Sequence, residues 1–258
     1  MPYTNLTEEI RKRVEKLHYV ESFYIHGSRG VGRNSPTSDI DYTFLIKDKK
    51  YDSALKKALK DLLAWEKLPG WYPDQTWEVC CTKKKAKKFN DVGYHTMPTK
   101  EAYKLASNLF KSKENLLKYQ DWAQFFVVEG KAVHDPQNHL IKLKKLVSKY
   151  PTSLANSVIK DMIFNLKTKL MWVSDRWTPR NKYAFINDIR DIVWYIALAH
   201  YAKNRAFLMN SMKRWHQDMP NFKPNIKKDL DNLIAIDDKF ETENKSIFLK
   251  RIIKKLEK

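Results

Sequence analysis

Cysteine, glycine and long apolar stretches are all scarce in this chain of 258 residues. The two cysteines, Cys80 and Cys81, are adjacent, and adjacent side chains on a strand point to opposite faces, so they suit neither a disulfide nor a metal chelate. The longest apolar stretch, Ile192 to Ala202, is about half a membrane span and predicts a buried helix. The N-terminal residues lack the apolar core of an export signal, so we expect a cytoplasmic protein with no membrane partner.

Positive charge, in contrast, is abundant, with a formal net charge of +19. Residues 1–138 carry 24 Lys and Arg against 18 Asp and Glu, a net of +6, whereas residues 139–258 carry 25 against 12, a net of +13. A basic surface attracts phosphates, nucleic acid or anionic lipid. Lysine codons favoured by an AT-rich genome would also explain an excess spread along the chain, so RNA remains one possible partner among others. The content of 43% hydrophobic and 13% aromatic residues excludes a disordered chain.

The periodicity of the apolar residues divides the chain into two parts. Up to residue 138, strand and helix patterns alternate, whereas the later residues carry only helical periodicity punctuated by prolines. We therefore expect an α+β protein, with a catalytic domain of mixed sheet and helices over residues 1–138 and an all-helical domain over residues 139–258. The expected strands are 19–26, 40–46, 76–81 and 131–136, and the expected helices are 7–17, 53–68, 99–129, 139–149, 153–174, 182–213 and 226–257.

Three of the six glycines, Gly27, Gly30 and Gly32, lie within six residues, directly after the first expected strand. This concentration indicates that the backbone needs unusual dihedral angles or approaches a ligand closely. The spacing matches neither the Walker, the Rossmann nor the kinase glycine pattern.

Carboxylates stand at the start of the second strand and on the third. Asp39 and Asp41 are two residues apart, so both side chains point to the same face. Glu78 lies between apolar neighbours, where an acid is costly to bury unless something pairs with it. Such carboxylates form a hard oxygen site for one or two Mg²⁺ ions. The alternative for Glu78 is a solvent-facing residue, with Asp74 as the substitute acid.

The glycine-rich loop suits the phosphates of an NTP co-substrate. Backbone N–H groups at Gly27 and Ser28, with the Ser28 hydroxyl, would hold triphosphate oxygens, and Arg29 and Arg33 would add charge-assisted contacts. An acceptor hydroxyl would attack the α-phosphorus in line and release pyrophosphate, while Glu78 accepts its proton. A plain surface hairpin with a capping serine and two solvated aspartates is the structural alternative.

The segment FYIHGSRGVGRNSPTSDIDYTFLI, residues 23–46, resembles the signature of the polymerase-beta-type nucleotidyltransferase superfamily. The resemblance implies that Gly27 and Ser28 bind phosphate and that Asp39 and Asp41 are metal ligands, with Glu78 as the third carboxylate. The helical second half is similar to that of the antibiotic (aminoglycoside and lincosamide) nucleotidyltransferases and their uncharacterised bacterial relatives. In these, a helical domain helps to bind the acceptor.

Asp188 and Asp191 are the acceptor-side candidates, because they are neighbours on one face of an expected helix. The resemblance implies that one of them orients an acceptor amine or hydroxyl, and the alternative is an ordinary polar helix face. The leading hypothesis is transfer of a nucleoside monophosphate to a small molecule such as an aminoglycoside or lincosamide. An RNA or protein acceptor and a degenerate nucleotide-binding module are the alternatives, and the oligomeric state stays open.

Overall fold

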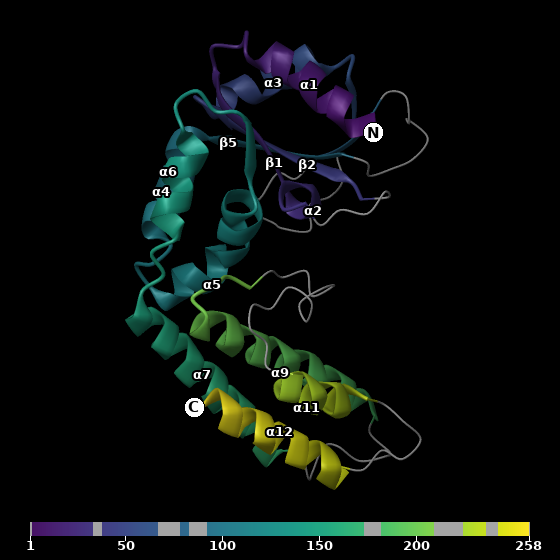
Figure 1. Ribbon diagram of the computed structural model, residues 1–258, viewed down its shortest axis with the longest axis vertical. Coiled ribbons are helices and arrows are strands. Elements are labelled where there is room, and N and C mark those ends of the chain that lie inside the picture. The colour runs from purple at the N-terminus through teal and green to yellow at the C-terminus, as the bar shows by residue number, and fades with distance from the viewer. Residues whose placement is uncertain are drawn as a thin grey trace. The chain divides into compact units, whose positions relative to one another are not determined.

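The computed structural model describes residues 2–32, 38–66, 78–82, 92–172, 182–208, 224–235 and 242–257. These residues pack into two compact units (Figure 1), the first comprising Met1–Lys111 with Lys118–Lys149 and the second Ser112–Leu117 with Tyr150–Lys258. None of the described helices combines the length and the apolar character that a membrane span needs.

The described strands of the first unit form one six-stranded sheet in the order β3-β4-β5-β2-β1-β6. Strands β2 and β5 run parallel, and the other neighbouring pairs are antiparallel. The sheet is therefore mixed, as predicted. Its strands are β1 (Val20–His26), β2 (Ile40–Ile46), β3 (Leu63–Glu66), β4 (Glu78–Thr82), β5 (Val92–Pro98) and β6 (Lys131–His134).

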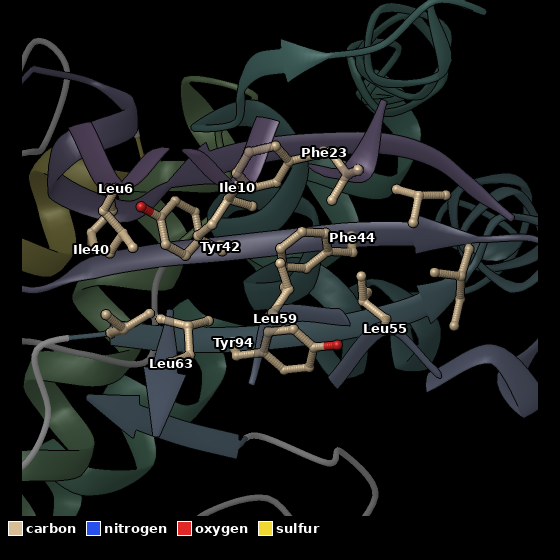
Figure 2. Close-up of a cluster of buried hydrophobic side chains, with 14 of the residues drawn as sticks. Leu6, Ile10, Phe23, Ile40, Tyr42, Phe44, Leu55, Leu59, Leu63 and Tyr94 are labelled. Atoms are coloured by element: carbon tan, nitrogen blue, oxygen red, sulfur yellow. The ribbon is translucent and has the colours of Figure 1, made fainter. Parts of the chain in front are cut away.

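One face of this sheet carries the main hydrophobic core. Phe23, Tyr42, Phe44 and Tyr94 alternate along β1, β2 and β5 and are at most 1% exposed. The rings of Phe23 and Phe44 stack with centroids 4.7 Å apart. Helices α1 (Pro2–Val14) and α3 (Asp52–Leu59) cover this face with leucine and isoleucine side chains (Figure 2). Because the aromatic residues bury large apolar areas, this face supplies much of the unit's stability.

The opposite face holds Tyr24, His26, Thr43 and His95, all of them buried. The remaining helical elements of the unit are α2 (Gly27–Gly30), the short η1 (Lys49–Tyr51), α4 (Thr99–Asn108), the π-helix η3 (Ala123–Val128) and α6 (His139–Val147). Later helices contact these strands: α4 contacts β2 and β5, and α6 and η3 contact β1. In Figure 1, α2 lies on one side of β1 and β2, and α1 and α3 lie on the other. Helix α5 (Lys113–Trp122) leads directly into η3.

All the regular secondary structure in the described part of the second unit is helical, as predicted. Helix α7 packs against α9 and α12, and α11 packs against α12. Fully buried aliphatic side chains such as Leu166, Ile192 and Leu249 form its core. The helices are α7 (Thr152–Met171), α9 (Lys182–Lys203), α11 (Pro224–Ile234) and α12 (Thr242–Leu256).

The structure differs from the sequence-based expectation at several places. Strand β5 was not expected, and α11 and α12 stand in place of one helix over 226–257. The division between the units falls after residue 149 rather than after 138, because α6 contacts α4, η3 and β1 of the first unit. The helix expected over 53–68 ends at Leu59, and β3 follows it, since pairing with β4 satisfies the backbone there. The helix expected over 99–129 is interrupted at 109–112 and turns into a π-helix at Ala123.

Candidate active site

The turn after β1 requires glycine for two independent reasons. Gly27 has a φ of +63°, a conformation that L side chains rarely adopt. A β-carbon added there would lie 2.6 Å from Asp41 Oδ2 and 3.1 Å from Phe125 Cε2. The antiparallel register pairs His26 with Asp41, which brings the end of β1 beside the start of β2. Two predicted site residues, Gly27 and Asp41, therefore lie directly against each other.

Asp39, directly before β2, and Asp41, within β2, differ in their exposure to solvent. Asp39 is exposed, whereas Asp41 is partly buried and its Oδ2 lies against Gly27 of α2. Burial raises the pKa of Asp41 from 3.8 to about 8, and the negative charges of Asp39 and Glu129 add to the rise, while Arg29 opposes it. Ionised Asp41 is thus costly at this place, and a cation bound beside it would offset that cost.

Arg29 connects α2 to the two residues that precede β2. Its Nε donates to the backbone oxygen of Asp39 at 2.8 Å, and its guanidinium also donates to the backbone oxygen of Ser38. These bonds hold the residue before β2 close to α2. Ser28 lies half-buried in α2, and Arg33 lies outside the described residues. The phosphate contacts expected of all three stay predictions.

Glu78 is placed by its backbone alone, at the start of β4. The register aligns Val79 with Gly93, and Gly93 with Asp41, whereas it aligns Glu78 with Tyr94. Aligned residues on neighbouring strands share a face of the sheet. The position level with Asp41 is therefore Val79. The side chain of Glu78 lies outside the described part of the chain, as does all of residue 74, so the third-carboxylate role of either acid stays a prediction.

Glu129 is an acid near this site that the sequence reasoning did not single out. It follows the π-helix η3, is only 7% exposed, and accepts a hydrogen bond from Gln124 Nε2 at 3.1 Å. A β-carbon at Gly30 would overlap the backbone oxygen of Glu129, so α2 and this segment are in close contact. The sequence does mark Glu129, because it is a lone acid at the end of the apolar run in FFVVEG. Glu78 was singled out by a similar feature, an acid between apolar neighbours.

Asp39 and Asp41 suit Mg²⁺ as a pair of ligands. Within the described residues, no three His, Cys, Asp or Glu side chains are close enough to hold a metal ion by themselves. Mg²⁺ is usually bound by one or two carboxylates and keeps waters and substrate phosphate oxygens as its other ligands. Two carboxylates would therefore be enough from the protein, and the role of Asp39 and Asp41 as Mg²⁺ ligands stays a prediction.

Two buried histidines lie on the same face of the sheet as Asp41. Burial lowers the pKa of His26 well below its ordinary value and that of His95 to about 4. The ring of Phe126 lies 4.8 Å from His26 and 4.5 Å from His95. Both imidazoles are therefore neutral at physiological pH.

The acceptor-side candidates in the second unit are engaged with a lysine. Lys169 on α7 donates to Asp188 at 2.6 Å and to Asp191 at 2.9 Å, both on α9. Burial lowers the pKa of Lys169, but the hydrogen bonds to the two aspartates outweigh it and the net shift is upward. Asp188 is only 5% exposed. This arrangement joins α7 to α9, and an additional acceptor role for the aspartates stays a prediction.

Comparison with known proteins identifies the catalytic domain. The sequence model of the nucleotidyltransferase domain matches residues 7–105, which include Gly27, Ser28, Asp39, Asp41 and Glu78. Among solved structures, a nucleotidyltransferase-like protein from Exiguobacterium sibiricum is similar with a TM-score of 0.46 and 12% sequence identity, over 97% of this chain and 74% of that one. A search of curated proteins finds no match. Nucleotidyltransferases generally use an NTP and a divalent metal ion. Residues 7–105 thus match the nucleotidyltransferase domain, and the enzyme class expected from the sequence is confirmed.

Proposed function

We propose that this nucleotidyltransferase transfers a nucleoside monophosphate from Mg²⁺-NTP, with ATP as the leading candidate, to a hydroxyl of a small molecule. An aminoglycoside or a lincosamide is the expected acceptor. The observation that supports the site is the contact between Gly27 and Asp41, where a β-carbon would lie 2.6 Å from the carboxylate oxygen. This close approach supports the proposal, because transfer from a metal-bound triphosphate needs a phosphate-binding turn and a metal-binding carboxylate side by side.

Each residue of the site has a proposed task. Asp39 and Asp41 would hold the divalent cation, which neutralises phosphate charge and stabilises the attacking and leaving oxygens when bound. Gly27 and Ser28 would bind triphosphate oxygens through backbone N–H groups and a hydroxyl. Arg29 orients Asp39 by holding its backbone oxygen. Glu78 would accept the proton of the attacking hydroxyl, a step that also needs its side chain to reach the face on which Asp41 lies.

An RNA acceptor is the second candidate, because residues 139–258 carry a net charge of +13. Aminoglycosides are cations, and a basic domain attracts them poorly unless its binding surface is locally acidic. Asp188 and Asp191 are acidic, but Lys169 shares its ammonium between them. The charge balance therefore favours an anionic acceptor such as RNA, whereas the resemblance to antibiotic enzymes favours a small cationic one. An experiment must decide between these two acceptors. The cytoplasmic location stays a prediction as well.

The decisive experiment measures pyrophosphate release from each of the four NTPs with Mg²⁺, in the presence of aminoglycosides, lincosamides or total tRNA. Asp39→Ala is the inactive control, because it removes an exposed candidate metal ligand without creating a cavity in the core. Release that needs a small molecule and disappears in the control would support the proposal. Release only with tRNA would support the RNA acceptor instead.

Two outcomes would contradict the site itself. Full activity of Asp39→Ala or Asp41→Ala would exclude these residues as the essential metal ligands. NTP binding without turnover with any acceptor, together with unchanged binding in Asp39→Ala, would favour a nucleotide-binding module.

A further inference from the structure

The aromatic ring of Phe125 lies directly against the turn after β1. An added β-carbon at Gly27 would lie 3.1 Å from Phe125 Cε2 and 2.6 Å from Asp41 Oδ2. We propose that Phe125 is a positioning residue, which keeps Gly27 in the place and conformation that triphosphate binding needs. This inference rests on the proposed function, which assigns the turn to the triphosphate. Phe125 lies beyond residues 7–105, so the match to the nucleotidyltransferase domain does not include it.

Two edge-to-face contacts orient the ring of Phe125. Its centroid lies 4.5 Å from that of His26, with an interplanar angle of 79°, and 5.3 Å from that of Phe126, with an interplanar angle of 85°. Aromatic rings favour such edge-to-face pairs. His26 is the last residue of β1 and directly precedes Gly27. The ring is therefore fixed relative to the strand end from which the turn begins.

The π-helix η3, which carries Phe125, is itself anchored on the sheet. The ring of Phe126 is only 3% exposed, and its centroid lies 4.5 Å from that of His95 on β5. Directly after η3, the backbone oxygen of Glu129 lies so close to Gly30 that an added β-carbon there would overlap it. The segment therefore contacts α2 at its last residue as well as at its first, and Phe125 cannot move away from the turn independently of this packing.

The contact with Phe125 limits the conformations that Gly27 can adopt. Glycine occupies many regions of φ and ψ at similar energy, so the φ of +63° at Gly27 must be held by its neighbours. The ring fills space where a side chain of Gly27 would project, beside the carboxylate of Asp41. A shorter side chain at position 125 would free this space, and the turn would then spend less time in its triphosphate-binding form. The apparent affinity for a triphosphate falls in proportion to that fraction of time.

The test measures binding of Mg²⁺-tripolyphosphate and of Mg²⁺-ATP to the full chain by isothermal titration calorimetry. Phe125→Leu removes the ring atoms that reach Gly27, and we expect it to weaken the binding of both ligands about tenfold. Phe125 is half-buried and leucine is apolar, so the variant should fold, which its melting curve checks. Phe125→Met, whose flexible side chain reaches about as far as the ring, should keep both affinities within about threefold of wild type.

Phe126→Leu is the matched control, because it makes the same change at the neighbouring ring, which packs on the two buried histidines. Phe126 is more deeply buried than Phe125, so this variant should lose more thermal stability. It should nevertheless keep both affinities within about threefold of wild type, because the atoms that contact Gly27 remain. A purely structural role of Phe125 predicts the opposite order, with the larger loss of affinity in Phe126→Leu.

Equal affinities of wild type and Phe125→Leu would overturn the proposal, as would an equal loss in Phe126→Leu. A loss confined to Mg²⁺-ATP would overturn it too, because the ring would then act on the nucleoside and not on the turn. Failure of the proposed function alone would look different, because wild type would then bind Mg²⁺-tripolyphosphate in a Phe125-dependent way without releasing pyrophosphate from any NTP. A wild type that binds neither ligand would overturn both.

Discussion

The substitution Asp41→Asn should make the metal-free protein more stable while removing its activity. Asp41 has a folded-state pKa of about 8, against 3.8 for an ordinary aspartate. The folded state therefore binds more protons than the unfolded state between these values, and the free energy of unfolding falls as pH rises through this window. Asparagine has nearly the same shape and carries no charge, so the variant should not lose stability over this window.

The size of the effect follows from the difference in pKa. A shift of one unit is worth about 1.4 kcal/mol, so a rise of about four units sets a ceiling of roughly 5–6 kcal/mol for Asp41 above pH 8. Relaxation of side chains and entry of water reduce this ceiling, and we expect about 2–4 kcal/mol at neutral pH. For units of this size the corresponding rise in melting temperature is roughly 5–10 °C.

Thermal unfolding in EDTA, measured from about pH 4 to pH 9, is the appropriate assay. The curves of wild type and Asp41→Asn should meet near the acid end and separate as pH rises. Added Mg²⁺ should stabilise wild type and not the variant, because a ligand that binds only the folded state raises its stability. A difference that is independent of pH, or an asparagine variant that is less stable near pH 8, would refute the reasoning. Glu101→Gln, which changes an exposed acid, is the matched control.

Three further predictions concern other parts of the chain. Gly27→Ala should lower the free energy of unfolding by roughly 2–4 kcal/mol and abolish transfer. Gly32→Ala should lower it by only about 1 kcal/mol, because Gly32 has a φ of +74° but nothing within 4 Å of an added β-carbon. Equal melting temperatures for the two variants would contradict the close approach at Gly27. Lys169→Met should destabilise the second unit by roughly 2–3 kcal/mol in chemical denaturation, because Asp188 is left buried without its cation, and an unchanged midpoint would argue against this account. Glu78→Gln should slow transfer about 100-fold with NTP binding intact, and weakened binding alone would indicate a structural role.

The first two strands and the turn directly after β1 could be predicted from sequence because local signals agree there. The alternating residues of β1 and β2, and the glycines between them, specify strand, turn and strand without reference to the rest of the chain. The spacing of Asp39 and Asp41 then places both carboxylates at the start of β2. The distance between the turn and the second carboxylate depends only on the antiparallel register, which pairs His26 with Asp41.

Strand β5 was not predicted because its residues are buried on both faces. Val92 and Tyr94 face the main core while His95 lies under Phe126, so the segment shows no alternation of polar and apolar residues. Glu129 was also missed. A lone acid at the end of an apolar run marks the residue, but no local pattern reports which distant turn a helix end will contact, and here that turn is α2.

The π-helix at Ala123–Val128 makes the site sensitive to the length of this segment as well as to its composition. A π-turn contains one more residue than an α-turn over nearly the same axial distance. Deleting one residue from this segment would allow it to become an ordinary α-helix and would rotate everything that follows by about 100° about the helix axis. Glu129 and Gly130 would then face another direction while every side chain of the turn after β1 remained intact. A one-residue deletion here should therefore impair the enzyme more than many substitutions of the same residues, and natural variation in length should be confined to other segments.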